Sequence, residues 1–119
     1  MKKNKSLIQE LALAIENIWF QHESQERYFT FDENGVKFDY YKCSEQRILA
    51  IGTAFMLSFE TAKSRFDKFI LLRGFEIALK NIEAKMQMKD LDVTDYCAFE
   101  ASIMTFNKMK DDLAKTLID

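Results

Sequence analysis

The stretch RYFTFDENGVKFDYYK, residues 27–42, gives the clearest local signal in this chain of 119 residues. Aromatic residues alternate with polar ones on both sides of Asn34-Gly35. This dipeptide is a preferred pair for a two-residue type I′ turn, whose central positions both need a positive φ. The stretch therefore predicts an antiparallel β-hairpin that turns at Asn34-Gly35.

The position of the turn sets the expected register of the two strands. Phe31 would face Phe38 and Phe29 would face Tyr40, all on one side of the hairpin. Aromatic pairs and opposite-charge pairs across two strands each stabilise a hairpin by roughly 0.2–1 kcal/mol. On the other side, the expected pairs are Asp32 with Lys37 and Tyr28 with Tyr41.

Residues 46–57, QRILAIGTAFML, fit either a third strand or a helix. As a strand, they would present small residues on one face, where a helix could pack closely. As a helix, they would present an apolar stripe, but that helix would have to join the next one into about forty uncapped residues, which is unusually long for a small domain. We therefore favour a strand. Its small face would hold Ala50, Gly52 and Ala54, whereas the alternative helical stripe would hold Ile48, Ile51, Phe55 and Phe59.

Three further segments show the apolar periodicity that is typical of helices. The first covers residues 6 to about 22, the second residues 64–88, and the third the residues after 92 up to Leu117. The second segment is apolar nearly all round, so we expect it to be central and buried. The chain contains no Pro and no repeat, which indicates a single domain over residues 1–119.

These elements predict an α+β fold: an N-terminal helix, a three-stranded antiparallel β-meander, and two long C-terminal helices packed on the sheet. The last helix carries apolar residues at spacings of three and four, like the a and d positions of a coiled coil. Such a seam suits packing on a helix of the same or of another copy, and we expect a homo-oligomer. The seam residues are Tyr96, Phe99, Ile103, Phe106, Leu113 and Leu117.

Composition limits the classes of function. Lys and Arg number 17 and Asp and Glu number 19, for a net charge of -2, whereas a general nucleic-acid-binding protein would show a strong basic excess. Hydrophobic residues make up 48% of the chain, which is enough for a core. Glu10 and Glu16 in the first helix argue against a signal peptide or a membrane span. We expect a cytoplasmic protein without a membrane partner.

Few residues could support catalysis or hold a metal ion. Cys43 and Cys97 are far apart in the sequence, and His22 is the one histidine. Two Cys and one His do not make a standard zinc site, and the chain has no phosphate-binding loop motif. We expect reduced thiols, with a Cys43–Cys97 disulfide as the alternative, and a protein that is not an enzyme and needs no metal or cofactor. Helix capping explains the nearby aspartates better than calcium binding does: Asp90, Asp92 and Asp95.

Basic residues gather where the helix of residues 64–88 begins. Free backbone N–H groups and the helix dipole attract anions at such an end, and nearby Lys and Arg would strengthen contact with a phosphate. An ordinary helix start with a solvated, charged face is the alternative. The candidate anion-binding residues are Lys63, Arg65, Lys68 and Arg73.

Gly74 lies inside the same helix, where glycine costs about 0.5–1 kcal/mol relative to Ala. The close approach of another backbone or of a ligand would offset that cost. Gly52, on the small face of the expected third strand, is the candidate for the facing surface.

Residues 67–78 have the form D-x-F-x-x-x-x-G-x-x-I-A. This segment resembles a helix opening in small phage-encoded proteins of unassigned or anti-defence function. The resemblance implies a phage origin, and hence the cytoplasm of the host cell, and a short strand before the helix, at Gly52-Thr53-Ala54-Phe55. The matching residues are Asp67, Phe69, Gly74, Ile77 and Ala78.

Two hypotheses about function follow, beside the less favoured one of an enzyme that uses Cys43 or Cys97. The first is a phage-encoded inhibitor of a host defence system that acts by stoichiometric binding of a defence protein or of a small nucleotide signal. The nucleotide would bind at the candidate anion-binding residues, and the protein at an aromatic surface, since aromatic residues dominate binding hot spots. The alternative is a small oligomeric structural or assembly protein, such as a chaperone. The aromatic candidates are Tyr28, Tyr40, Tyr41 and Phe59.

Overall fold

The computed structural model describes residues 2–118, and the side chains of residues 7–118. Four helices dominate this part of the chain: α1 (Lys2–His22), α2 (Tyr40–Thr61), α3 (Arg65–Gln87) and α4 (Val93–Ile118). A single 3-10 turn, η1 (Glu26–Tyr28), and two antiparallel strands, β1 (Phe29–Asp32) and β2 (Gly35–Phe38), connect α1 to α2. Among these described residues, no helix has an apolar stretch long enough to cross a lipid bilayer.

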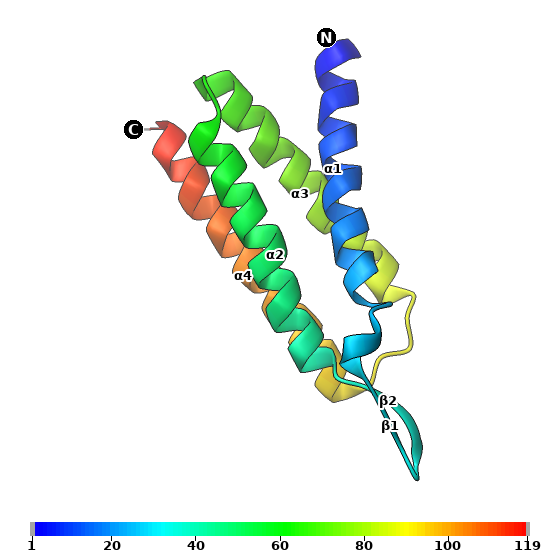
Figure 1. Ribbon diagram of the computed structural model, residues 1–119. Helices are drawn as coiled ribbons and strands as arrows, with labels where there is room; N and C mark the ends of the chain where they lie inside the picture. The colour runs from blue at the N-terminus through cyan, green and yellow to red at the C-terminus, as the bar shows by residue number, and fades with distance from the viewer. Residues whose placement is uncertain (1, 119) are drawn as a thin grey trace.

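The four helices form an open, elongated bundle in which α2 and α4 lie side by side and α1 packs on α3 (Figure 1). The molecule measures 55 × 28 × 22 Å, and its radius of gyration is 15.9 Å. A compact domain of this length would have a radius of gyration of about 13.5 Å. The core between the helices includes Trp19 of α1, Ile51 and Phe55 of α2, Phe75 of α3 and Phe106 of α4.

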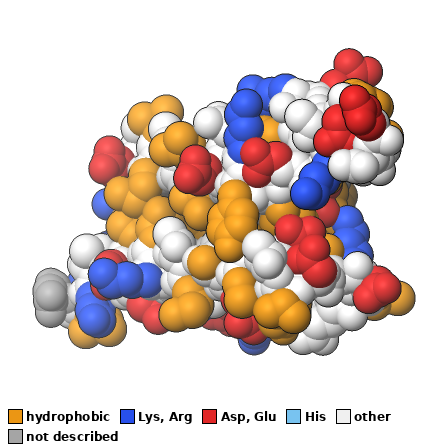
Figure 2. All heavy atoms as spheres, turned by 90° about the horizontal axis from the view of Figure 1, so that it is seen from below, with side chains coloured by type: hydrophobic (Ala, Val, Ile, Leu, Met, Phe, Trp, Pro, Cys, Tyr) orange, Lys and Arg blue, Asp and Glu red, His pale blue; other side chains and the backbone are white. Residues whose placement is uncertain are grey.

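The open shape leaves many apolar side chains at the surface. Figure 2 shows a band of them on the face seen from below, with charged side chains along its edges. Large hydrophobic residues that are more than half exposed include Leu49 and Leu57 of α2, Phe66 of α3 and Met104 of α4. A surface of this kind is typical of proteins that bind a partner.

The predicted hairpin is confirmed, but the predicted register is wrong by two residues. Asp32 pairs with Gly35 and Phe31 pairs with Val36, so the turn lies one residue earlier than expected. The Asp32 side chain accepts a hydrogen bond from the Asn34 amide at 2.8 Å, and Gly35 takes a φ of 111°. The carboxylate therefore stabilises a turn that competes with the type I′ turn. Because the shift is even, the phenylalanines of both strands keep their common face.

The third strand expected at residues 46–57 is wrong, because these residues lie within α2. Asp39 caps this helix by accepting a hydrogen bond from the Lys42 amide at 3.0 Å. The helix does not join α3, since the backbone becomes extended at Ala62 and Ser64 caps α3 through the Asp67 amide at 3.1 Å. The stripe that faces the core is the alternative one: Ile48, Ile51, Phe55 and Phe59.

The two long C-terminal helices are present as α3 and α4, but they pack mainly on α1, on α2 and on each other rather than on the sheet. A sheet of two four-residue strands is too small to cover the apolar faces of such helices. The first helix begins at Lys2, before the expected residue 6. Capping by an aspartate is confirmed at Asp92, whose side chain accepts a hydrogen bond from the Asp95 amide at 2.8 Å.

Gly74 lies where α3 crosses α1. A Cβ atom at this position would come within 3.0 Å of the Leu11 Cβ atom and 3.4 Å of the Ile8 carbonyl oxygen. The predicted close approach of another backbone is therefore confirmed. The expected facing residue is wrong, since Gly52 lies in α2 with the rest of the strand that the resemblance implied, and no other side chain or element of the described chain comes within 4 Å of a Cβ placed there.

Candidate functional site

The hairpin of β1 and β2 projects from one end of the helical bundle (Figure 1). Phe31 and Val36 form a cross-strand pair near its turn and expose 76% and 63% of their surface. Asp32 and Glu33 are also exposed, and they place two carboxylates beside this apolar pair. We call Phe31, Asp32, Glu33 and Val36 the hairpin tip. An aromatic ring so exposed on a projecting element is typical of a residue that contacts another protein.

An aromatic cluster fixes the base of the hairpin to the bundle. The Phe38 ring packs edge-on against the rings of Phe29, Tyr40 and Tyr28, with centroid distances of 4.8, 5.8 and 6.1 Å. The Asp39 amide donates a hydrogen bond of 2.7 Å to the Tyr28 carbonyl oxygen. Because an isolated two-stranded hairpin is at best marginally stable in water, these contacts hold the hairpin tip in its position.

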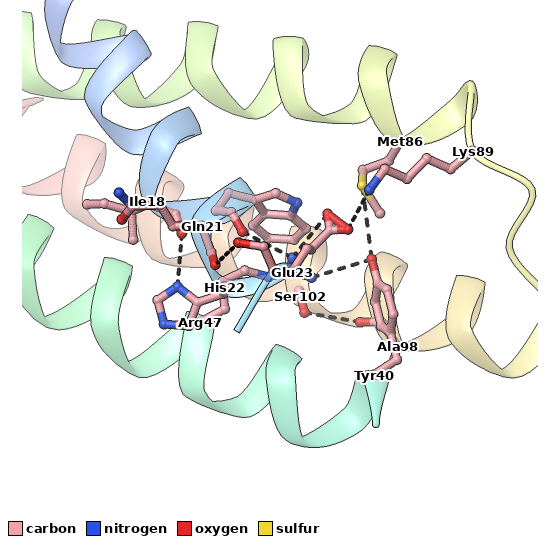
Figure 3. A network of polar contacts seen from close by, with 12 residues as sticks. Ile18, Gln21, His22, Glu23, Tyr40, Arg47, Met86, Lys89, Ala98 and Ser102 are labelled. Carbon is pink, nitrogen blue, oxygen red and sulfur yellow. Dashed lines mark hydrogen bonds and ion pairs between the residues drawn. The ribbon is translucent and has the colours of Figure 1, made fainter. Parts of the chain in front are cut away.

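A buried ion-pair network lies beside Tyr40, one member of this cluster (Figure 3). Arg47 of α2 is fully buried, and its guanidinium carbon lies 3.3 Å from the centre of the Trp19 ring. Its Nη1 atom lies 3.6 Å from Glu23 Oε1, and Lys89 Nζ donates a hydrogen bond of 2.7 Å to Glu23 Oε2. Its Nη2 atom donates to the Tyr40 hydroxyl at 3.5 Å. The network thus joins the end of α1, the start of α2 and the segment after α3 at the base of the hairpin.

Sequence reasoning selected neither the residues of the hairpin tip nor Arg47, which holds the base of the hairpin. A buried charge is strongly unfavourable unless it is paired, and here the Glu23 carboxylate and the face of the Trp19 ring compensate it. A signal for the burial of Arg47 is present in the sequence, because Arg47 precedes Ile51 and Phe55 of the helical stripe at intervals of four residues. In a helix it therefore falls on the buried face, whereas the strand interpretation gave no reason to bury it.

Burial raises the pKa of the Tyr40 hydroxyl from 10.0 to about 12, although the nearby Arg47 guanidinium opposes the shift. The folded state therefore favours the neutral phenol. This stabilisation is complete below the unfolded-state pKa of about 10 and is lost as the pH rises from 10 toward 12. We expect a tyrosine absorbance titration to show a late phenolate step that Tyr40→Phe removes.

The control for this titration is the denatured protein, in which all tyrosines should titrate together near pH 10. The hydrogen bond and the charge of Glu100 also raise the pKa of Tyr96, so the comparison is made in a Tyr96→Phe background. A late step that persists there after Tyr40→Phe would contradict the assignment to Tyr40.

The two cysteines are both free, Cys43 buried in the bundle and Cys97 exposed on α4, so the alternative of a Cys43–Cys97 disulfide is wrong. Burial raises the pKa of the Cys43 thiol, with the Arg47 charge opposing this effect. A buried thiol with a raised pKa is a poor nucleophile, because the thiolate is the reactive form. His22 is also buried, and its Nδ1 atom bonds the Ile18 carbonyl oxygen at 2.9 Å.

Three of the four candidate anion-binding residues already contact other groups of the chain. Lys63 lies in the connection before α3 and is exposed. The helix start already has its cap in Ser64 and an acidic residue in its first turn, which favours the alternative of an ordinary helix start. Anion binding there stays a prediction. The other three cations have partners within the chain: Arg65 donates to the Leu117 carbonyl oxygen, Arg73 pairs with Glu76, and Lys68 Nζ lies 5.2 Å from the centre of the Phe59 ring.

The aromatic candidates do not form one exposed surface. Tyr28 is 1% exposed and Tyr40 and Phe59 are each 4% exposed, so these three side chains belong to the core. Tyr41 exposes 55% of its surface, at the start of α2. Tyr28 and Tyr40 instead hold the base of the hairpin. Phe31, which the predicted register had paired with Phe38, is more exposed than Tyr41, at 76%.

The seam of α4 is largely used within the chain. Phe99, Ile103 and Phe106 are buried in the bundle, where α4 packs on α2 and α3. The seam was predicted to pack on a helix of the same copy or of another copy. These three residues pack on helices of the same copy. Tyr96 remains 39% exposed, and Leu113 and Leu117 are half-buried at the far end of the helix.

Within residues 7–118, no group of three or more His, Cys, Asp or Glu side chains is arranged to hold a metal ion. The exposed Phe31–Val36 pair on its anchored hairpin makes the hairpin tip the candidate site. Comparisons with protein-family models, with curated proteins and with solved structures find no match for this chain.

Proposed function

We propose that this chain is a non-catalytic binding protein that contacts another protein through its hairpin tip. The observation that carries this proposal is the Phe31–Val36 pair, which is exposed to solvent on a hairpin with an anchored base. A rigid aromatic side chain that enters a pocket of a partner loses little conformational entropy on binding. Such side chains supply most of the binding energy in many protein interfaces.

The chemistry of the hairpin tip indicates the kind of pocket that it fits. Phe31 and Val36 require an apolar cavity, and the exposed carboxylates of Asp32 and Glu33 favour basic groups around its rim. A membrane surface fits this tip less well, because anionic lipid headgroups would repel the two carboxylates. We therefore expect the partner to be a protein whose apolar pocket has a basic rim.

The resemblance of residues 67–78 to small phage-encoded proteins supports a more specific version of this proposal. In it, the partner is a protein of a host defence system, and the chain inhibits it by stoichiometric binding that covers the pocket. A small nucleotide signal has less support as the ligand, since three of the four candidate cations have partners within the chain.

Replacing Phe31 with Ala is expected to weaken binding of the partner by about 30-fold or more, the effect of losing a hot-spot side chain. The free energy of unfolding should change by less than about 0.5 kcal/mol, because the ring is exposed. The wild-type chain would first be used to isolate a partner from defence-active cells. The purified partner would then be titrated with each variant by calorimetry.

The matched control is Phe66→Ala, which removes an exposed ring at the start of α3, at the opposite end of the bundle (Figure 1). This variant should bind the purified partner like the wild-type chain. Equal binding by the Phe31→Ala variant, or binding to anionic phospholipid vesicles in place of a protein, would overturn the proposal.

The alternative function, a small oligomeric structural or assembly protein, also has support from one feature. The outer face of α2 is apolar and exposed, as expected of a surface that another chain covers.

A further inference from the structure

The outer face of α2 carries no charged side chain over residues 48–59. Leu49, Thr53 and Leu57 follow one another at intervals of four residues and form a ridge on this face, which we call the α2 ridge. Its two leucines expose 61% and 62% of their surface. Three helical turns of solvent-facing helix without a charge are unusual on a monomer, whose exposed helix faces are normally polar.

A shallow groove lies on each side of the α2 ridge. The groove toward α4 has a volume of about 430 Å³, and its lining includes Gly52, Met56, Met109 and one charged residue, Glu60. The groove on the other side has a volume of about 490 Å³ and is lined in part by Ala50 and Ala54, with Arg27 as its one charged residue. The face thus offers both a ridge that can enter a groove and grooves that can accept a ridge.

No contact within the described chain explains why residue 52 is a glycine. A glycine inside a helix makes the helix less stable than an alanine would. At position 74 the close approach of α1 explains why the residue is a glycine. At Gly52 no other side chain or element of this part of the chain comes within 4 Å of a Cβ placed there. The missing side chain therefore leaves room for a backbone that comes from outside the chain.

The surface area allows such a contact. The chain exposes 8129 Å², whereas a folded monomer of 14.0 kDa is expected to expose about 6700 Å². The excess of roughly 1400 Å² is larger than the roughly 800 Å² that each partner buries in a standard interface.

We propose that a second copy of this chain covers the outer face of α2, and that the α2 ridge of each copy enters the Gly52 groove of the other. A two-fold symmetric dimer uses the same patch on both copies, so that patch has to be complementary to itself. The α2 face meets this requirement because it carries the ridge and the groove together. The uncharged stretch of α2 over residues 48–59 also fits a homodimer, since interfaces between separately stable partners are no more apolar than the remaining surface.

The hairpin tip contributes no residue to this face, so the dimer and the binding function are independent of each other. A dimer would present two hairpin tips, and a partner with two pockets would then bind with higher avidity than either contact alone provides.

The test is the mass of the intact chain in solution, measured by sedimentation equilibrium over a range of concentrations. The wild-type chain should have twice the mass of 14.0 kDa. Gly52→Leu should weaken self-association about 30-fold or more, because its side chain fills the groove, and Leu57→Glu should do the same by adding a charge. Both variants should stay folded, since neither position packs against the core, and circular dichroism would verify this.

Ala84→Leu is the matched control, because it adds the same side chain at an exposed position of α3 and should leave the dimer unchanged. A wild-type mass of one chain at every concentration would overturn the proposal. A dimer that persists in both Gly52→Leu and Leu57→Glu would overturn it as well, since the interface would then lie elsewhere.

Discussion

Replacing Arg47 with Ala is expected to lower the free energy of unfolding by about 3–5 kcal/mol, the usual effect of removing one partner of a buried ion pair. The side chain of Glu23 is 12% exposed and would keep only the contact with Lys89. The Trp19 ring would lose the guanidinium group that lies over it, and a cavity would form beside it. Most of the network at the base of the hairpin would therefore be lost with this one side chain.

Chemical denaturation of the wild-type and Arg47→Ala chains would measure this change. Lys89→Met is the matched control, because it removes the other cation that contacts Glu23, at a side chain that is 42% exposed. An exposed ion pair contributes at most about 1 kcal/mol. If the two variants lowered the free energy of unfolding equally, the claim that the network depends mainly on Arg47 would be contradicted. Hydrogen exchange of residues 29–38 should also become faster in Arg47→Ala, because the hairpin loses its anchor.

Replacing Gly74 with Ala is expected to lower the free energy of unfolding by about 1–2 kcal/mol. The new methyl group would lie 3.0 Å from the Leu11 Cβ atom, and overpacking of this kind typically costs about 1–3 kcal/mol. The higher helix propensity of Ala stabilises the helix by about 0.5–1 kcal/mol. The net loss of folding free energy is therefore smaller than the loss from the clash alone. Since both Cβ atoms are attached directly to a helix backbone, α1 and α3 have to move apart.

Gly52→Ala is the matched control for this variant, since it makes the same substitution inside a helix at a position with open space around it. It should raise the free energy of unfolding by about 0.5–1 kcal/mol. The comparison should be made by denaturation at a concentration where the chain is monomeric. A Gly74→Ala chain that is as stable as the Gly52→Ala chain would contradict the close crossing of α1 and α3.

The two positions also separate the fold from the proposed dimer. Gly74 lies inside the bundle, where its replacement disturbs the contact of α1 with α3. Gly52 lies on the outer face of α2, where a larger side chain should leave the fold intact and affect self-association alone. A chain that responds in this way would use its two helical glycines for the same physical purpose, one within a copy and one between copies.

Only part of the candidate site could be predicted from the sequence. Residues 27–42 predicted the hairpin, but the predicted register paired Phe31 with Phe38 and did not indicate that Phe31 would be exposed. The turn formed one residue earlier because the Asp32 carboxylate bonds the Asn34 amide, a contact that competes with the preference of Asn-Gly for a type I′ turn. Tyr28 and Tyr40, selected as contact residues, became the anchor of the hairpin.

The sequence by itself determined the features that depend on neighbouring residues. These are the hairpin, the cap at Asp92, and the periodicity of α1, α3 and α4, because turn and capping contacts join residues only a few positions apart.

The tertiary structure alone decided between strand and helix for residues 46–57, since both patterns were apolar and the burial of Ile51 and Phe55 against other helices selected the helix. It also decided that Arg47 is buried, because Trp19 and Glu23, which compensate its charge, reach it from another helix and the connection that follows it. Residues that lie close in space but far apart in the sequence leave no periodic signal, and only the packed structure brings them together.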